Sequence, residues 1–401
     1  MSKSAPLKVL IAGGGIGGLT AALALARRGF DVEVYEQAGE VREVGAGVQV
    51  GPSAMRIFHA LGLMDAVMTV AAQPLRSEFR MWNTAEAWKR FDLGPVSVAT
   101  YGFPYVTLYR PDLLGILVQA LGRRVPTGLH LGARVIGHDQ DGTATRLHLA
   151  DGRSIEGDVL IGADGIHSVI RGDLFGARVA EFTGLVAWRG TIPIERLPER
   201  LRAPISAAWI GPHRHAVQYP LRRGELMNLV GVVERTDWRD ESWTTRGTHA
   251  DMAHDFKGWH ADVHTMMAAI EQPFLWALIL RKPLPRWSMG HVTLLGDAAH
   301  PTLPFLASGA VMAIEDGFVL ARALERYGAN LQEGLRAYER ARLERTSRVV
   351  KGSADNAGRF HNQALSQPDT AQAFFAAEFT PERLRERYDW LYSYDATQVQ
   401  I

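Results

Sequence analysis

The stretch Leu7-Lys8-Val9-Leu10-Ile11-Ala12-Gly13-Gly14-Gly15-Ile16-Gly17-Gly18 decides the class of fold. Its first six residues are mostly apolar and predict a buried strand, and the glycines that follow satisfy the pattern G-x-G-x-x-G. Residues 19–28 predict a helix that Gly29 ends. Residues 31–36 predict a second strand that closes with an acidic side chain. Strand, glycine turn, helix and strand in this order predict a βαβ unit that binds a dinucleotide.

Each part of this unit has a physical task. Gly13 permits the tight turn, Gly15 lets the backbone approach a pyrophosphate, and Gly18 lets the helix pack closely on the strand. The helix N-terminus offers unpaired N–H groups and a positive dipole to the phosphates. Glu36, at the end of the second strand, is placed to accept hydrogen bonds from an adenosine ribose. The unit alone does not choose between NAD and FAD.

Two later segments repeat the pattern of strand, turn and helix. Residues 158–171 contain Gly162-Ala163-Asp164-Gly165, and residues 292–301 contain Gly296-Asp297. The three motifs in this order resemble the class A flavoprotein aromatic hydroxylases, the para-hydroxybenzoate hydroxylase-like family. The resemblance implies that the segment with Asp164 and Gly165 contacts both FAD and a nicotinamide nucleotide. It also implies that Gly296 and Asp297 bind the ribityl chain and pyrophosphate of FAD.

The resemblance covers nearly the whole chain through residues 43–52, 209–222 and 307–316, and it is strongest to 3-hydroxybenzoate 6-hydroxylases and salicylate hydroxylases. It implies a single-component monooxygenase that hydroxylates the ring of a small phenolic acid with FAD, NADH or NADPH, and O2, through a flavin hydroperoxide. No second G-x-G-x-x-G follows, so the nicotinamide nucleotide is expected to bind transiently. A hydroxylated N-heteroaromatic acid such as 6-hydroxynicotinate is an alternative substrate. A flavin oxidase or dehydrogenase, and a non-catalytic flavin-binding protein, are alternatives of other classes.

The predicted strand at residues 214–219 carries the candidate catalytic side chains. Alternation with a period of two puts His215 and Tyr219 on one face. A phenolate reacts faster than a phenol, so the enzyme needs a base, and His215 resembles the histidine that activates substrate in 3-hydroxybenzoate 6-hydroxylases. A structural histidine is the alternative. Tyr219 is expected to hydrogen-bond the substrate. Pro304 stands in a loop where those hydroxylases have a glutamine, and there the chain resembles salicylate-type and para-hydroxybenzoate-type enzymes.

Four further residues are candidate ligands of cofactor or substrate. Arg110 resembles the arginine that contacts FAD in the family, with a surface charge at a helix start as the alternative. Gly309 follows a proline-containing loop and opens a predicted helix, whose N-terminus would stabilise an anionic flavin. Gln49 is expected to line the substrate pocket or to bind the backbone. Arg189 is expected to bind a substrate carboxylate or to form a structural ion pair.

The composition favours a globular enzyme with a small partner. The chain has 401 residues, a formal net charge of +1 and no cysteine. A nearly neutral protein has no overall field that recruits nucleic acid or an anionic membrane. Without cysteine there is no disulfide, thiolate metal site or cysteinyl flavin link, so we expect no metal and non-covalent FAD. The chain shows no signal peptide and no apolar run of about 18 residues, which predicts a cytoplasmic protein without a membrane span.

The fold class is predicted as α/β with an interrupted nucleotide-binding domain. Because the nucleotide motifs lie near the start, the middle and residue 297, a Rossmann-like FAD domain at 1–182 and 278–330 must be discontinuous. A mostly antiparallel substrate domain at 183–277, with parts of 74–105, interrupts it. A helical region at 331–401 follows. Its aromatic residues are expected to pack on the core, with a homodimer contact as the alternative.

Overall fold

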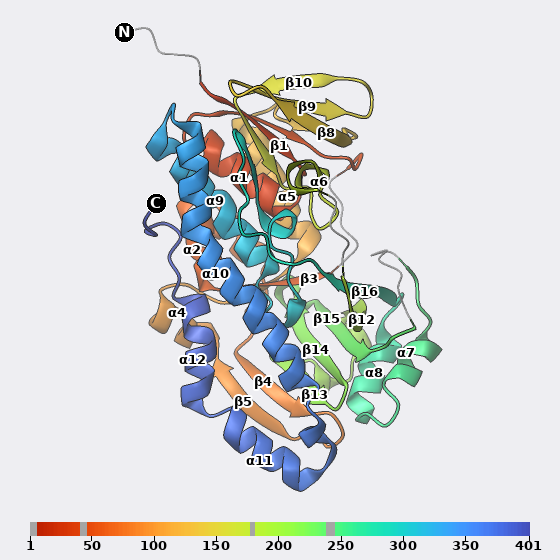
Figure 1. Ribbon diagram of the computed structural model, residues 1–401. Helices are drawn as coiled ribbons and strands as arrows, with labels where there is room; N and C mark the ends of the chain where they lie inside the picture. Colours follow the sequence, from red (N-terminus) through yellow and green to blue (C-terminus); the bar gives the residue numbers. More distant parts are fainter. Residues whose placement is uncertain (1–5, 41–45, 177–180, 238–244) are drawn as a thin grey trace.

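The computed structural model describes residues 6–40, 46–176, 181–237 and 245–401. One half of the molecule is built on a five-stranded parallel sheet (Figure 1). Its strands, in spatial order, are β17 (Val292–Leu294), β11 (Val159–Gly162), β1 (Lys8–Ala12), β2 (Asp31–Tyr35) and β7 (Leu129–His130). The strands come from three distant parts of the chain, as the three predicted motifs require. The carboxyl ends of β1, β11 and β17 therefore lie side by side.

Helices pack on this sheet through small residues. Every residue of α1 (Ile16–Ala26) is buried, and α1 packs against α9 (Gly309–Tyr327) and α5 (Arg110–Arg124). A Cβ atom on Gly317 would lie 2.7 Å from the backbone nitrogen of Ala21, so α9 approaches α1 closely only because residue 317 has no side chain. A three-stranded antiparallel sheet of β8 (Val135–Gln140), β9 (Thr145–Leu149) and β10 (Ser154–Gly157) contacts β1, β11 and α6 (Val169–Phe175).

The other half is built on a seven-stranded sheet in which only one neighbouring pair, β13 with β4, is parallel. Its strands, in spatial order, are β16 (Phe274–Leu280), β12 (Glu181–Pro193), β15 (Leu226–Glu234), β14 (Arg214–Leu221), β13 (Ser206–Gly211), β4 (Arg76–Met81) and β5 (Ala87–Asp92). Helices α7 (His249–Asp255) and α8 (Ala261–Ala269) pack on one face with the apolar side chains of β12 and β15. The opposite face is turned toward the C-terminal helices.

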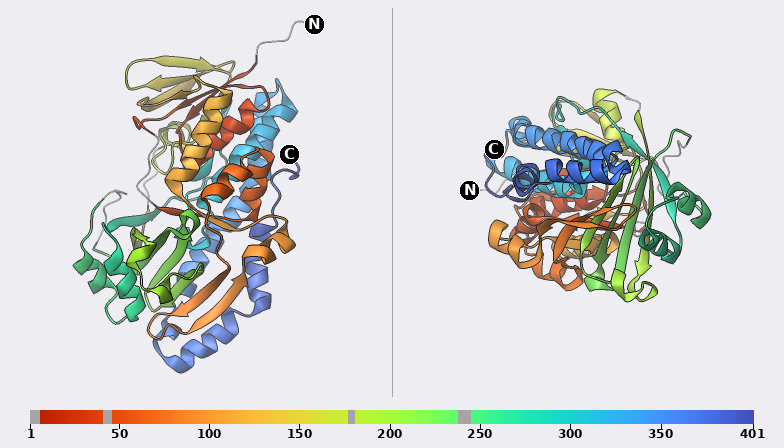
Figure 2. Two further views of the ribbon diagram at one scale, coloured as in Figure 1. Left: turned by 180° about the vertical axis from the view of Figure 1, so that it is seen from behind. Right: turned by 90° about the horizontal axis from the view of Figure 1, so that it is seen from below.

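The C-terminal region is helical and joins the two halves. Helix α10 (Leu331–Phe360) runs from the parallel sheet down to the seven-stranded sheet, and α11 (Pro368–Glu378) and α12 (Pro381–Tyr392) continue around its lower end (Figures 1 and 2). The C-terminal aromatic residues pack inside the molecule: Phe375 stacks on Trp88 with ring centres 3.8 Å apart, and Tyr388 meets the Phe91 ring at 5.4 Å. The packing interpretation of these residues is therefore confirmed.

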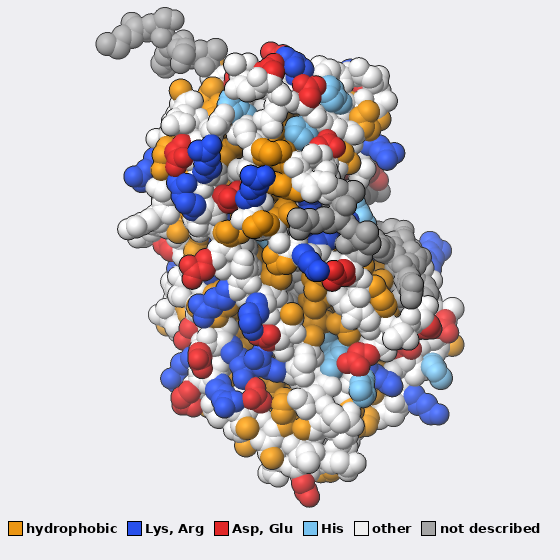
Figure 3. All heavy atoms as spheres, in the orientation of Figure 1, with side chains coloured by type: hydrophobic (Ala, Val, Ile, Leu, Met, Phe, Trp, Pro, Cys, Tyr) orange, Lys and Arg blue, Asp and Glu red, His pale blue; other side chains and the backbone are white. Residues whose placement is uncertain are grey.

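The predicted fold class is confirmed, since a nucleotide-binding α/β unit, a largely antiparallel sheet and a helical C-terminal region are all present. The domain boundaries themselves stay a prediction. Shorter elements connect the halves: β3 (Gly47–Val50), α2 (Pro52–Ala60), α3 (Met64–Val70), α4 (Gly94–Tyr101) and β6 (Val106–Tyr109). Among the described helices, none is both long and apolar enough to cross a membrane. On the face shown in Figure 3, basic and acidic side chains are interspersed.

Candidate active site

A continuous cavity of about 630 Å³ joins the parallel sheet to the seven-stranded sheet. Its nucleotide side is lined by nearly all the predicted cofactor residues, namely Gly13, Gly15, Glu36, Arg110, Asp164, Gly165, Gly296, Asp297 and Gly309. Its sheet side is lined by four of the predicted catalytic or substrate residues, namely Gln49, His215, Tyr219 and Pro304. Residues that are far apart in the sequence thus share one enclosure.

The glycines of the first motif have the geometry that the sequence predicts. Gly13 has φ +106°, and a Cβ there would lie 2.4 Å from the carbonyl oxygen of Ala163. A Cβ on Gly18 would lie 2.1 Å from the carbonyl oxygen of Gly13, so Gly18 is needed for packing of helix on strand. A Cβ on Gly15 would meet no protein atom within 4 Å and would point into open space at the start of α1. The protein itself does not require glycine at position 15, whereas a closely bound ligand does.

Two acidic side chains hold the loops at the edge of the cavity. Glu36 accepts hydrogen bonds from the backbone N–H groups of Gly14 at 2.7 Å and Ala38 at 2.9 Å, which leaves its remaining acceptor positions for a ribose. Asp164 accepts a bond from the backbone N–H of Val169 at 2.8 Å and one from the Ser168 hydroxyl. The Asp164 carboxylate therefore caps the start of α6. Gly165, with φ +76°, turns the chain along the cavity wall.

A buried ionic cluster holds the third motif in place. Asp316 of α9 accepts bonds from the backbone N–H of Gly296 at 3.0 Å, from His300 Nε2 at 2.6 Å and from Arg342 Nε at 2.7 Å. Asp297 lines the cavity, and its side chain is accessible there. Burial raises the pKa of Asp297, and the nearby Arg110 guanidinium opposes this shift.

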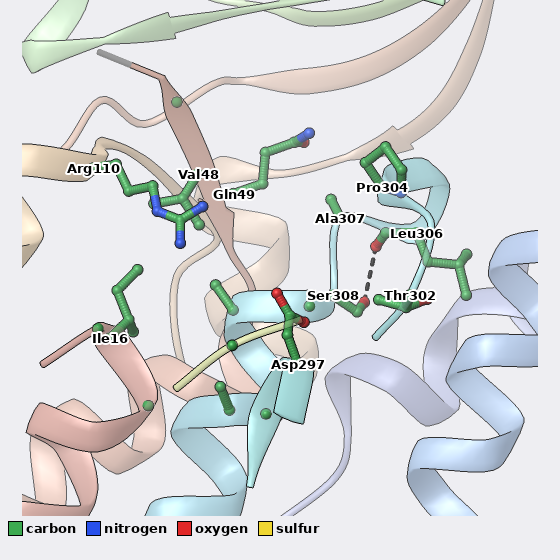
Figure 4. A pocket seen from close by; sticks show the side chains of 18 of the residues that line it. Ile16, Val48, Gln49, Arg110, Asp297, Thr302, Pro304, Leu306, Ala307 and Ser308 are labelled. Carbon is green, nitrogen blue, oxygen red and sulfur yellow. Dashed lines mark hydrogen bonds between the residues drawn. The ribbon is translucent and has the colours of Figure 1, made fainter. Parts of the chain in front are cut away.

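The loop before α9 forms another wall. Figure 4 shows Arg110 and Asp297 projecting into the hollow, with the loop from Thr302 to Ser308 beside them and the Gln49 amide extended toward that loop. Within the loop, the Ser308 hydroxyl donates to the carbonyl of Leu306 at 2.8 Å. Gly309 begins α9 at the cavity wall, so the unpaired N–H groups of its first turn lie beside the cavity.

The loop geometry also bears on Pro304. Its carbonyl oxygen accepts the backbone N–H of Ala307 at 2.9 Å, and Pro304 lies at the cavity wall. The bond to Ala307 uses part of the acceptor capacity of this carbonyl. Pro304 is thus placed to shape the loop and the cavity, and a direct catalytic role for it stays a prediction.

Strand β14 brings His215 and Tyr219 to the cavity, with Val217 between them, as the alternation predicted. Gln218, on the other face, accepts a hydrogen bond from the Trp209 indole at 2.9 Å. Burial raises the pKa of Tyr219, and Arg110 opposes this shift. A Cβ on Gly47 would lie 2.4 Å from the Tyr219 ring, so β3 closes over this tyrosine.

His215 is 2% exposed and lies among aromatic side chains. The rings of Phe305 and Phe360 meet it edge-on, with ring centres at 4.9 Å and 5.3 Å. Its Nδ1 lies 2.7 Å from Nε2 of His361, the residue that follows α10. Burial, with a contribution from His361, holds the pKa of His215 well below its ordinary value of 6.5. His215 is therefore neutral at physiological pH, as a general base requires.

A group of polar residues that sequence reasoning missed lines the cavity near Tyr219. Tyr105 donates a hydrogen bond to Gln49 Oε1 at 2.6 Å, so Gln49 is bound by another side chain of the pocket. Arg90 lines the cavity from β5, and its guanidinium carbon lies 4.1 Å from the centre of the Tyr388 ring. Its buried Nε has no hydrogen-bond partner among the described residues.

Arg189 is not among the residues that line the cavity. It pairs in register with Val230, which does line the cavity, but lies one strand farther out on β12. Its guanidinium carbon lies 4.7 Å from the centre of the Trp276 ring. The structure therefore does not bring Arg189 together with the other predicted substrate residues, and its binding of a substrate carboxylate stays a prediction. Of the glycine-rich segment expected before Gln49, residues 43–45 lie outside the described residues.

Comparison with known proteins decides the family. A family model described as FAD binding domain matches residues 6–353. The chain belongs to this FAD-binding family. It is 37% identical over 396 residues to 3-amino-4-hydroxybenzoate 2-monooxygenase PtmB3 of Streptomyces platensis, with 98% of this chain and 97% of the relative covered. The predicted class A flavoprotein aromatic hydroxylase is confirmed, and the protein is a FAD-dependent aromatic-ring monooxygenase.

Two further relatives act on related compounds. A 3-hydroxybenzoate 6-hydroxylase of Polaromonas naphthalenivorans is 35% identical, with 98% of this chain and 97% of the relative covered. A 6-hydroxynicotinate 3-monooxygenase of Bordetella bronchiseptica is 37% identical, with 87% of this chain and 91% of the relative covered. Among solved structures, Klebsiella pneumoniae HpxO complexed with FAD and uric acid superposes with a TM-score of 0.84 at 27% identity, covering 96% of this chain and 97% of that chain.

The residues of the cavity fit FAD. Gly15 leaves open space at the N-terminus of α1, where a pyrophosphate is stabilised by unpaired N–H groups. Glu36 lies at the end of β2 for the adenosine ribose, and Asp297 and Arg110 face the same hollow. The N-terminus of α9, at Gly309, provides the positive dipole that an anionic flavin needs.

Proposed function

We propose that this monooxygenase hydroxylates the ring of a small aromatic acid that already carries a hydroxyl group, with NADH or NADPH and O2. FAD, once reduced, supplies the activation of O2. The three relatives are named for 3-amino-4-hydroxybenzoate, 3-hydroxybenzoate and 6-hydroxynicotinate, which share a ring, a hydroxyl and a carboxylate. Both a phenolic acid and a hydroxylated N-heteroaromatic acid fit this description.

The proposal depends on one observation, which is that His215 and Arg90 line the same cavity. His215, buried and neutral, takes the proton of the substrate hydroxyl and so makes the ring electron-rich. Because the imidazole is neutral, it can accept that proton, and it places no positive charge in the cavity before the proton is transferred. The phenyl rings of Phe305 and Phe360 fix its orientation and exclude water from it.

Arg90 is the cationic partner for the carboxylate. It is the extra residue of a β-bulge, because Phe91 pairs with Ser77 and Lys89 pairs with Glu78. Bulges re-aim side chains next to active sites. The Arg90 guanidinium is held by the rings of Phe79 and Phe91, each 4.9 Å away, and by Tyr388. A guanidinium that is oriented by aromatic rings retains its N–H donors for a carboxylate.

The two groups lie apart across the sheet. Ser77, beside the bulge, pairs with Ser206 of β13, which is at the opposite end of that strand from Ile210, the partner of His215. A substrate that places its hydroxyl at His215 and its carboxylate toward Arg90 would lie along β13 and β14. Tyr219 would then lie beside the acidic end of the substrate.

The test is a panel of hydroxybenzoates and hydroxynicotinates with purified FAD-loaded protein. We expect one or more of these acids to stimulate NADH or NADPH oxidation and to yield a product with one added oxygen atom, identified by mass spectrometry. Stimulated oxidation without a hydroxylated product would support the alternative of a flavin oxidase or dehydrogenase.

Homodimer formation and a cytoplasmic location are parts of the same proposal. Light scattering tests the first, and cell fractionation tests the second.

A further inference from the structure

A chain of four polar side chains links the base to solvent. His215 is 2% exposed, and its Nδ1 lies 2.7 Å from Nε2 of His361. Nδ1 of His361 lies 3.0 Å from Oε1 of Glu234, whose Oε2 lies 2.7 Å from Nδ1 of His213. The side chains of Glu234 and His213 are 43% and 60% exposed. These four side chains therefore connect the buried base to the surface through three contacts.

We propose that His215, His361 and Glu234 form a proton path between the substrate hydroxyl and solvent. The inference rests on the proposed function, because it needs a substrate proton at His215. Glu234 and His361 also line a hollow in the surface near the lower end of α10, which gives water access to the end of the path. Phe305 and Phe360 pack against His215 but offer it no hydrogen-bonding group. Among the described residues, the hydrogen-bond partner of the His215 side chain is His361.

The backbone fixes the members of this path relative to one another. His213 and Glu234 lie at neighbouring ends of β14 and β15, where the backbone N–H of Glu234 donates to the carbonyl of His213 at 3.1 Å. The backbone N–H of His213 donates in turn to the carbonyl of His361 at 3.3 Å. The end of α10 is thereby tied to the strand that carries His215, so the four side chains are held by main-chain bonds.

The direction of each hydrogen bond follows from the acceptor at the surface. Partial burial opposes ionisation of Glu234, but bonds from His213 and His361 outweigh it and lower the pKa of Glu234. An ionised carboxylate only accepts, so Nδ1 of His361 carries a proton. Burial lowers the pKa of His361, against a raising effect of Glu234, so its ring is neutral and its Nε2 is an acceptor. Nδ1 of His215 must then donate to it.

The consequence is that Nε2 of neutral His215 carries no proton and is free to act as the base. When the substrate O–H bond breaks, an N–H bond forms at this Nε2. The proton on Nδ1 of His215 passes to Nε2 of His361, and the proton on Nδ1 of His361 passes to Glu234 and then to water. Reprotonation of the product oxygen along the same path in reverse restores both tautomers, so no net charge accumulates.

The first test follows deprotonation alone. The oxidised, FAD-loaded enzyme without NAD(P)H is mixed in a stopped-flow instrument with 4-hydroxy-3-nitrobenzoate, whose phenolate absorbs visible light, at an acidic pH at which the free probe is in its phenol form. We expect phenolate to form as fast as binding in the wild type, and at least about 10-fold more slowly in His361→Ala. Added imidazole should restore the rate, because it can enter from the surface hollow. Glu234→Gln should also slow the step, whereas His254→Ala, an exposed histidine on α7, should not.

Phenolate formation at the wild-type rate in both His361→Ala and Glu234→Gln would overturn the proton path. Slowing without rescue by imidazole, together with a lowered melting temperature, would assign His361 a structural role and would also overturn it. A probe that binds without forming phenolate in the wild type removes His215 as the base.

A second measurement needs no substrate. In ¹⁵N-histidine spectra of the ligand-free holoenzyme, we expect His215 to be neutral with its proton on Nδ1, assigned by comparison with His215→Asn. A proton on Nε2 would reverse the direction of the hydrogen bond between His215 and His361 and would overturn the inference. If the nitro probe does not bind at all, the proposed aromatic-acid function fails, and the ¹⁵N spectra still decide the direction of the path.

Discussion

Replacement of Arg90 by methionine should separate acidic from neutral substrates. A hydrogen bond to a charged group contributes about 1.5–3 kcal/mol. At about 1.4 kcal/mol per factor of ten, its loss corresponds to a decrease of roughly 10-fold to 150-fold in kcat/KM for a hydroxybenzoate. Phenol has no carboxylate, so its kcat/KM should change by about 3-fold or less. Methionine keeps most of the volume between Phe79, Phe91 and Tyr388 but removes the guanidinium.

The assay compares product formation from hydroxybenzoate and from phenol in the wild type, Arg90→Met and Arg90→Lys. Lysine keeps the charge without the planar fork, so Arg90→Lys should retain part of the preference for the acid. Arg76→Met is the matched control, because Arg76 lies on the adjacent β4, is half-exposed and does not line the cavity. Equal losses with the two substrates would refute the assignment, since Arg90 would then act only through packing, which the melting temperature would register.

Three further predictions concern the cofactor, the pH dependence and the ionic cluster. Gly15→Ala should leave the apoprotein as stable as the wild type but reduce flavin absorbance after purification, because the added Cβ meets no protein atom within 4 Å and lies at the wall of the cofactor cavity; a fully yellow variant would contradict this. The pKa values of His215 and His361 are lowered on folding, so the unfolded chain binds more protons below pH 6.5 and stability falls as pH decreases from there toward their folded-state values. The loss is up to about 1.4 kcal/mol per pH unit for each histidine. The free energy of unfolding of His215→Asn, measured by urea denaturation at several pH values, should therefore depend less steeply on pH than that of the wild type. Asp316→Ala should lower the free energy of unfolding by about 3–5 kcal/mol, because it leaves Arg342 without one buried partner, and an unchanged urea midpoint would exclude this cluster as a stabilising element.

The cofactor half of the cavity was largely predictable because its chemistry is local. A glycine turn after a strand and before a helix determines its own geometry, and Gly13 adopts the positive φ that the motif requires. Period-two alternation likewise predicted that His215 and Tyr219 share the face of β14 that lines the cavity. Asp164 lines the cavity, but its capping of α6 was visible only in the structure.

The substrate half was less predictable because alternation selects a face of a sheet and not a position across it. Arg189 is one strand beyond the cavity wall. Arg90 reaches the cavity through a β-bulge, which the sequence of residues 87–92 does not predict. Tyr392 and Phe360 line the same cavity from helices more than a hundred residues beyond β14. A cluster of basic or aromatic residues has no sequence signal when each member comes from a different element.

The sequence by itself determined the dinucleotide-binding unit and the strand face that carries His215 and Tyr219, because turns, caps and strand alternation act between neighbouring residues. The choice of FAD came from the resemblance to the family. Only the tertiary structure decided what surrounds that histidine. His361 follows a 30-residue helix with no motif at its end, and Glu234 ends a strand of the seven-stranded sheet. The contacts of His361 with His215 and with Glu234 depend on where α10 crosses the sheet, and packing over the whole chain sets that crossing.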